Sequence, residues 1–199
     1  MLKGEYESMQ ELYKVAPSFV PRPICWGSCA EPGRHYFLSE FHDLDTGLPS
    51  IVDFTREVAK LHNESCSPNN MFGFHITTYN GTLVQDNNWT KSWEESYSNR
   101  IRCTLALEEA ARGPSEELKE LSNSLLEKVI PRLLRPLETQ GRTVKPSLLH
   151  GDLWIGNIAT DKATGHPMIF DSSAYYGHHE CEICLHMRAS FHWLTFQMS

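Results

Sequence analysis

Apolar side chains recur at three- and four-residue intervals in three segments of the chain, which predicts three amphipathic helices. The three apolar faces consist of Ile51, Phe54, Val58 and Leu61; of Trp93, Tyr97, Ile101 and Leu105; and of Leu118, Leu121, Leu125, Val129 and Leu133. Gly113-Pro114 separates the second helix from the third, and Pro131 predicts a kink or an end in the third. A charged helix over residues 3–15 comes before these three, and another over residues 178–193 comes after them.

Shorter apolar runs bounded by turn residues predict a few strands. The prolines at positions 17, 21 and 23 favour extended chain, and a strand is expected at 35–41. Asn80-Gly81 indicates a short hairpin in an otherwise loop-like stretch. Residues 146–150 read as a buried strand, and residues 157–173 as strand, turn and strand. The fold class predicted by this order is α+β, a helix-rich body that holds a small β-hairpin.

Composition narrows the class of protein. The 199 residues are 40% hydrophobic and 22% charged, which is typical of a packed globular chain. The net charge of −7 and the lack of a basic block argue against a nucleic-acid partner. No apolar run reaches the about 18 residues that a membrane span needs, so no membrane partner is expected. The charged first residues do not read as a signal peptide, so a cytoplasmic location with free cysteine thiols is predicted.

Polar side chains stand at the ends of the predicted hairpin strands. Asp152 and Asn157 follow the strand at 146–150, and Asp171 follows the last hairpin strand directly. A carboxylate can accept a hydroxyl proton, and carboxylate and amide oxygens are ligands that Mg²⁺ prefers. The spacing D-x-x-x-x-N with a later Asp is that of a kinase catalytic loop and its metal ligands. The alternative is that these residues only build tight turns.

Five segments of the chain resemble the fructosamine/ketosamine-3-kinase family, which is related to the aminoglycoside phosphotransferases. They are LKGEYESMQEL, YFLSEFHDL, FGFHITTYNGTLVQDNNWTKSWEESYSNRI, LLHGDLWIGN and MIFDSSAYYGHHECE. The resemblance implies a protein-kinase-like α+β fold, mostly the helical large lobe with its catalytic β-hairpin. It divides the chain into a small-lobe and hinge remnant at 1–42 and a large lobe at 43–199. The implied activity is ATP-dependent phosphorylation of ribulosamine or fructosamine adducts on protein lysines, at the sugar 3-hydroxyl, with Mg²⁺.

The resemblance also implies roles for particular residues. By their place in the motifs, Asp152 resembles the catalytic base, and Asn157 and Asp171 resemble magnesium ligands. The residues that resemble ATP-binding positions are Glu5, which would hold the ATP-binding Lys, and the adenine hinge Ser39, Glu40, Phe41 and His42. Those expected near the sugar are Trp154, Gln85 and Trp89. His150 is expected to brace the loop. The implied partner is a glycated protein or amine, and the oligomeric state is left open.

The chain departs from the family pattern at both ends and at one internal position. No glycine-rich phosphate loop precedes Glu5, Lys3 falls in a helix, and the family's later helices are missing after HWLTFQMS. A truncated chain is therefore expected, with severe loss of activity and exposed apolar surface. Its alternative function is that of a non-catalytic kinase remnant with a binding or regulatory role. Ser172, where the family has Pro, is expected to loosen the turn after Asp171.

A cysteine- and histidine-rich stretch near the end offers another interpretation. Cys181 and Cys184 form a C-x-x-C, with His178, His179 and His186 close by, a spacing that can hold zinc. No second ligand pair follows, and no βαβ pattern supports a thioredoxin-like redox site. Packing of these side chains in a helix is the favoured interpretation.

Overall fold

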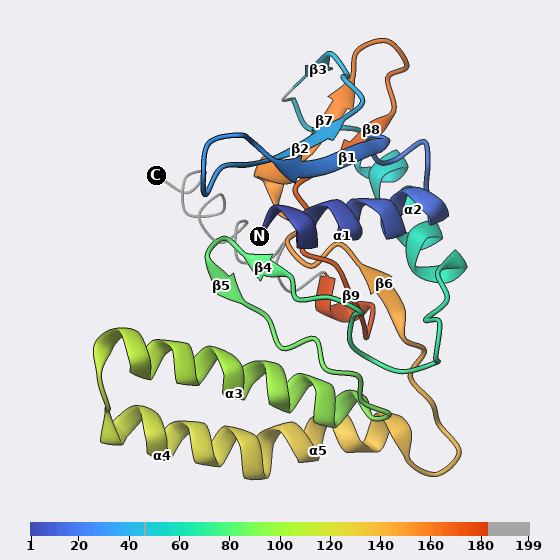
Figure 1. The fold of residues 1–199 in the computed structure, drawn as a ribbon. Coiled ribbons are helices and arrows are strands. Elements are labelled where there is room, and N and C mark those ends of the chain that lie inside the picture. The colour runs from blue at the N-terminus through green and yellow to red at the C-terminus, as the bar shows by residue number, and fades with distance from the viewer. Residues whose placement is uncertain (46, 183–199) are drawn as a thin grey trace, which may run out of the picture.

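A β-hairpin stacked on a helix lies in one half of the molecule, and a pair of long helices forms the opposite end (Figure 1). The computed structural model describes residues 1–45 and 47–182. The helix is α1 (Leu2–Val15), and the hairpin consists of β1 (Pro23–Ser28) and β2 (His35–Ser39). The two strands pair antiparallel, and α1 contacts both. The predicted helix at 3–15 and strand at 35–41 are confirmed, and the proline-rich extended segment leads into β1.

Apart from that pair of helices, the other elements are one helix, one three-stranded antiparallel sheet, which lies beyond the β1–β2 hairpin at the top of Figure 1, and two two-stranded sheets. They comprise β3 (Leu44–Asp45), α2 (Ile51–Glu64), β4 (Tyr79–Asn80), β5 (Leu83–Val84), β6 (Ser147–Leu149), η3 (Ile155–Asn157), β7 (Ile158–Asp161), β8 (Pro167–Ile169) and β9 (Tyr175–Gly177). The strand order is β3-β7-β8 in one sheet, with β4-β5 and β6-β9 as separate pairs. The predicted hairpin turn is confirmed at Gly81, whose φ of +59° is the left-handed conformation that glycine adopts without strain.

Two antiparallel helical stretches form the other end of the molecule (Figure 1). They are α3 (Trp93–Arg112), followed by α4 (Glu116–Ser124), the π-helical turn η1 (Leu125–Val129), α5 (Ile130–Leu134) and the 3₁₀ turn η2 (Arg135–Glu138). Glu138 accepts hydrogen bonds from the backbone N–H of Trp93 at 2.8 Å and of Glu94 at 3.5 Å. The side chain of Glu138 therefore caps the start of α3.

The apolar face predicted for the third helix changes register at the π turn. The Ile130 N–H bonds the Leu125 carbonyl, five residues back, just before Pro131, which has no N–H of its own. Such a turn moves every later side chain by one position around the helix. Ile130 is accordingly buried, whereas the predicted Val129 is 43% and Leu133 is 62% exposed. The proline was correctly predicted to disturb the helix, but the last two positions of the apolar face were wrong. The prediction for Leu121 was wrong as well, since it lies before the π turn and is 62% exposed.

The core lies where α1, α2 and α3 meet the paired strands. Its buried members include Met9, Leu12, Phe19, Leu61, Phe72, Trp93, Leu148, Leu149, Ile169 and Tyr176. Phe54 and Val58 of α2 pack against this core, as their spacing predicted, but Ile51 at the start of the helix is 79% exposed. The first turn of α2 therefore projects past the core, and the prediction for Ile51 was wrong.

Two expectations from the sequence concern membranes and the end of the chain. Among the described residues, no helix combines the length and the apolar character that crossing a bilayer requires. Most of the helix predicted at 178–193 lies outside the described residues. Cys184 and His186 of the alternative zinc site lie outside them too.

Candidate active site

The loop after β6 turns sharply at a glycine. We call residues 150–157 the catalytic loop. Gly151 has φ +81°, and a Cβ added there would lie 2.3 Å from the carbonyl oxygen of Ser173. Only glycine allows this approach, because any side chain would clash with the neighbouring backbone. The turn places the catalytic loop against the segment that follows β8.

His150 holds the catalytic loop from within the core. Its side chain is fully buried, with Nε2 3.0 Å from the Phe170 carbonyl and Nδ1 3.3 Å from the backbone N of Asp152. Because a carbonyl accepts and an N–H donates, this is the neutral Nε2–H tautomer. Burial lowers the pKa of the imidazole, which agrees with a neutral ring. His150 therefore braces the loop, as the sequence predicted.

The side-chain amide of Asn157 joins the two aspartates. Its Nδ2 donates to the Asp152 carbonyl oxygen at 2.9 Å and to the Asp171 carbonyl oxygen at 3.3 Å, and lies 3.4 Å from Asp152 Oδ2. Asn157 is buried, at the end of η3, whereas the Asp171 residue is exposed. Asp171 adopts φ +59°, a left-handed conformation that is uncommon without glycine. The three residues singled out from the sequence thus lie together at the ends of β6 and β8.

The carboxyl of Asp152 is half-buried and close to a second negative charge. Burial raises its pKa, and the charge of Asp171 raises it further. The nearby His150 and hydrogen bonds from the side chains of Asn157 and Asn80 oppose this shift. A carboxylate with a raised pKa binds a proton more readily, which suits a base that takes a hydroxyl proton.

Helix α1 brings a third carboxyl to this group. Glu5 is partly buried, and burial together with the charge of Asp171 raises its pKa to about 7. The helix is fixed in place because the Ser8 hydroxyl accepts from the backbone N–H of Ala174 at 3.0 Å. Gly4 lets the same helix approach a second segment, since a Cβ there would lie 2.5 Å from the Thr77 carbonyl oxygen. The segment that carries Asp171 and the helix that carries Glu5 are therefore packed directly together.

The raised pKa of Glu5 predicts a specific pH dependence of stability. Between pH 4.5, the ordinary pKa, and about pH 7, the folded chain holds a proton that the unfolded chain has lost. Stability therefore falls over this range as the pH rises, and then stays level. Glu5→Gln, which cannot ionise, is expected to melt at a higher temperature than the wild type at pH 8 and at a similar one at pH 4.5. Equal melting temperatures for Glu5→Gln and the wild type at pH 8 would contradict this prediction. The control is Glu109→Gln at an exposed position on α3, which should melt like the wild type at both pH values.

The predicted hinge residues lie at the end of β2 and beyond it. The backbone N–H of Glu40 donates to the Arg22 carbonyl, and Phe41 is 86% exposed. His42 Nδ1 lies 2.5 Å from Asp161 Oδ2, which ties this segment to β7. The segment thus connects the β1–β2 hairpin to the β3-β7-β8 sheet, and Ser39 is the last residue of β2.

The three residues predicted near the sugar differ in their surroundings. Trp154 is 44% exposed and its ring lies over Gly156, where an added Cβ would be 2.4 Å from the ring. Gln85 is bonded at both ends of its amide, to the Ser173 carbonyl and to Arg100. Trp89 packs beside the Tyr176 ring, with centroids 6.1 Å apart. Of the three, Trp154 presents an open aromatic face within the catalytic loop.

Some site residues were not singled out from the sequence. Asn80, interpreted there only as a turn residue, hydrogen-bonds the Asp152 carboxyl. Glu182 is buried and accepts from two backbone N–H groups of the catalytic loop. Ser172 was expected to loosen its turn, but its hydroxyl donates to the His150 carbonyl at 2.8 Å and tightens it. These contacts join distant segments, so no local spacing could reveal them.

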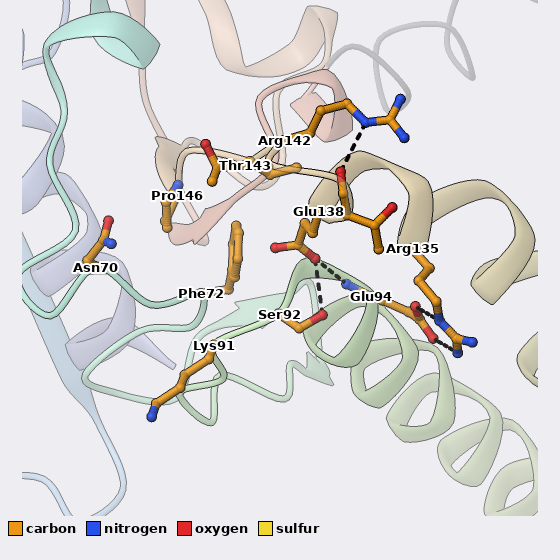
Figure 2. A pocket seen from close by; sticks show the side chains of 12 residues that line it. Asn70, Phe72, Lys91, Ser92, Glu94, Arg135, Glu138, Arg142, Thr143 and Pro146 are labelled. Atoms are coloured by element: carbon orange, nitrogen blue, oxygen red, sulfur yellow. Dashed lines mark hydrogen bonds and ion pairs between the residues drawn. The ribbon is translucent and has the colours of Figure 1, made fainter.

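Two surface hollows lie outside the group of Asp152, Asn157 and Asp171, although the second takes in Leu153 of the catalytic loop and Glu182. Figure 2 shows the first, of about 520 Å³, where Glu138 points to the start of α3 and Glu94 pairs with Arg135. The second, of about 1190 Å³, is mostly apolar and lies beside α2. Neither is lined by Asp152, Asn157 or Asp171. Glu94 and Glu138 in the first hollow are already paired, with Arg135 and with Ser92, and the candidate site stays with the catalytic loop.

The site suits a divalent cation. Burial and the charge of Asp171 raise the pKa of Glu5, and no Lys or Arg within residues 1–45 and 47–182 forms an ion pair with Glu5 or Asp171. With Nδ2 of Asn157 bonded to backbone carbonyls, its Oδ1 is the atom left to face a ligand. A cation with oxygen ligands would relieve the crowding of negative charge. No group of three His, Cys, Asp or Glu side chains in the described part of the chain forms a metal site by itself, so an amide and other oxygens would have to contribute.

Solved structures define the fold class of the chain. A thermostable mutant of an aminoglycoside phosphotransferase matches with a TM-score of 0.59 at 14% identity, over 94% of this chain and 66% of that chain. A Thermobifida fusca protein assigned as a fructosamine-3-kinase matches with a TM-score of 0.74 at 22% identity, over 95% and 60%. The fold is that of the aminoglycoside phosphotransferase-like kinases, as the sequence predicted.

The sequence comparisons then identify the family. The chain belongs to the fructosamine kinase family, whose model matches residues 1–196. A chloroplastic protein-ribulosamine 3-kinase of Oryza sativa subsp. japonica is 31% identical over 192 residues, 96% of this chain and 53% of the relative. A ketosamine-3-kinase of Mus musculus is 43% identical over 208 residues, 93% of this chain and 64% of the relative. The chain thus spans between half and two thirds of the length of these relatives.

Proposed function

We propose that this chain carries the catalytic loop of a kinase that transfers the γ-phosphoryl group of ATP to the 3-hydroxyl of a ketosamine. The observation that carries the proposal is the Asn157 amide, which donates to both Asp152 and Asp171 and so unites the three residues. The kinase names of the relatives support the reaction class. Residues 1–42 would form the small-lobe and hinge part, and residues 43–199 the large lobe.

Asp152 is the proposed base. Its carboxyl accepts the proton of the sugar 3-hydroxyl as that oxygen forms a bond to the γ-phosphorus. The bond between the γ-phosphorus and the bridging oxygen breaks, and ADP leaves with the electron pair. The raised pKa of the carboxyl favours this proton transfer, and the Asn157 amide holds the Asp152 backbone in place during it.

Asn157 and Asp171 are the proposed ligands of Mg²⁺. When bound, magnesium would neutralise phosphate charge as the transferred group moves. Asp171 presents an exposed carboxylate, and its backbone is held by the hydrogen bond from Asn157. The hinge at Ser39–His42 is proposed to bind adenine, and the Glu5 carboxyl is proposed to hold a lysine of the ATP site.

The proposed substrate is a ribulosamine or fructosamine attached to a protein lysine or a free amine. Trp154, two residues after Asp152 in the catalytic loop, is 44% exposed, and sugars stack well on aromatic rings. The product would be a ketosamine 3-phosphate, which breaks down to release the amine, so the role would be deglycation. The cytoplasmic location expected from the sequence stays a prediction.

Two measurements on the chain test this proposal. The first follows ATP-dependent phosphate transfer to a ribulosamine-lysine compound. The second follows the melting temperature in magnesium-ATP, where nucleotide at 100 times its dissociation constant should stabilise the fold by about 2.7 kcal/mol. Asp171→Asn is expected to remove most of this stabilisation, because it removes a proposed metal ligand, whereas exposed Asp53→Asn on α2 should retain it.

The results separate the proposal from its alternative. A thermal shift with no transfer, in a folded sample, would favour the alternative of a non-catalytic kinase remnant that binds nucleotide. Neither shift nor transfer would contradict both. Transfer together with the shift would support the kinase function for the chain itself.

A further inference from the structure

Two contacts fix the proposed adenine hinge to its surroundings. The backbone N–H of Glu40 donates to the Arg22 carbonyl at 2.9 Å, just before β1 begins. Two residues later, His42 Nδ1 lies 2.5 Å from Asp161 Oδ2, at the end of β7. Phe41 lies between these contacts and is 86% exposed. The hinge is therefore held to the β1–β2 hairpin by its backbone and to the β7–β8 hairpin by the His42 side chain.

The contact between His42 and Asp161, which we call the clasp, is sheltered from solvent. The two side chains are 24% and 7% exposed, so salt and water screen their attraction less than that of a surface ion pair. Because a carboxylate only accepts, His42 Nδ1 carries the proton, and a hydrogen bond to an ionised acceptor is a strong one. Asp161 Oδ1 accepts from the backbone N–H groups of Ala163 and Thr164, at 2.8 and 2.9 Å. The turn therefore fixes the carboxylate that His42 meets.

The β7–β8 hairpin carries the proposed metal ligands at its other end. Asn157 comes directly before β7, and Asp171 comes two residues after the end of β8 at Ile169. The two strands pair with each other along the hairpin, between the clasp and these ligands. One ATP molecule has to reach from the hinge to the metal, so both parts of the site must stand at the right separation. The clasp joins the element that would bind adenine to the element that would bind the metal.

The neighbouring contacts hold the sheet without the clasp. Lys162 Nζ lies 2.7 Å from Asp43 Oδ1, and the Lys162 backbone N–H donates to the Asp43 carbonyl at 3.0 Å. Strand β3 then pairs with β7 through Leu44 and Asp45. All of these contacts come after His42 in the chain. Loss of the clasp is therefore expected to free the hinge and to leave the β3-β7-β8 sheet in place.

From this geometry we infer that Asp161 is a positioning residue for the nucleotide, which acts through His42 to hold the adenine hinge in place relative to the magnesium ligands. The inference rests on the proposed function, because it concerns the same nucleotide site. A site that must be assembled before it binds loses apparent affinity in proportion to the fraction that is assembled. Loss of one hydrogen bond to a charged group should therefore raise the Kd for magnesium-ATP by about 10-fold. The catalytic loop keeps its own contacts, so kcat at saturating ATP should not follow.

The experiment measures the Kd for magnesium-ATP from melting-temperature titrations, together with kcat and KM for ATP. In His42→Ala, the Kd and the KM for ATP are expected to rise by about 10-fold, while kcat at saturating ATP stays near the wild-type value. His42→Asn restores an N–H donor at the δ position of the side chain, so it should return the Kd to near the wild-type value. The matched control is His166→Ala, at an exposed position of the same hairpin, which should bind magnesium-ATP like the wild type.

Each result decides the inference. A purely structural contact would lower the melting temperature of His42→Ala without changing its Kd, and that result would overturn the inference. A Kd for His42→Asn as weak as that of His42→Ala would overturn it too. If His42→Ala does not fold, Asp161→Asn takes its place, since its amide oxygen can still serve the turn, and the same rise in Kd is expected.

The wild type separates this inference from the proposed function. If the wild-type chain binds no magnesium-ATP, the proposed function and the inference fail together. If the wild type binds it and the clasp variants bind it equally well, only the inference fails.

Discussion

Replacing Asp152 by Asn is expected to reduce phosphate transfer by between about 10²- and 10⁴-fold, the usual contribution of a general base. The asparagine side chain has nearly the same size but cannot take the hydroxyl proton. The fold should survive, because Asp152 holds the loop through its backbone, which accepts from Asn157 and donates to His150. The measurement is kcat for a ribulosamine-lysine compound, alongside the melting temperature.

Asp53→Asn on the exposed face of α2 makes the same chemical change away from the site. It should leave kcat at the wild-type value, and it should lower the melting temperature only slightly, because the partly exposed ion pair with Arg56 contributes little stability. Retained turnover in Asp152→Asn would exclude this residue as the base. A large loss of stability in that variant would instead show that its carboxyl is needed for folding.

Replacing Gly151 by Ala is expected to destabilise the chain by about 3 kcal/mol, which combines backbone strain with a clash. At φ +81° a side chain is strained, and the new Cβ would meet the Ser173 carbonyl at 2.3 Å, so the backbone must move. For a chain of this size, the melting temperature should fall by about 10 °C. Thermal unfolding followed by circular dichroism measures this directly.

Gly165→Ala provides the matched comparison, because Gly165 also has a positive φ, of +72°, but nothing lies within 4 Å of an added Cβ. Only the backbone strain of about 1 kcal/mol is expected there. If the two variants melted at the same temperature, the close approach of the catalytic loop to Ser173 would not be the source of the effect.

Much of the local structure was predictable from the sequence. The spacing of Trp93 and Tyr97 predicted an α3 that packs inward, and the Asn80-Gly81 pair predicted the β4–β5 turn. The order of Asp152, Asn157 and Asp171 along two neighbouring strands predicted that they would meet. These features depend on short-range geometry, in which residue spacing decides which side chains share a face.

The register of the helix before Pro131 shows where this reasoning stops. A strict helical repeat placed Val129 and Leu133 on the buried face, but the π turn moved Ile130 and Leu134 there instead. The proline at position 131 predicted that the regular helix would be interrupted there. The sequence did not show whether the helix would end, bend or add a residue to one turn, because packing against α3 also determines which of these occurs.

The sequence by itself determined which residues could do chemistry at this site, since carboxylate, amide and glycine are needed at those spacings. Only the tertiary structure decided what surrounds them. It placed Ser8 against Ala174, 166 residues away, and Glu182 beneath Gly151, 31 residues away. The raised pKa of Glu5 likewise arises from burial and from Asp171, which no local pattern connects to α1. Such contacts form only when the chain closes on its core, and they set the charge and rigidity of the site.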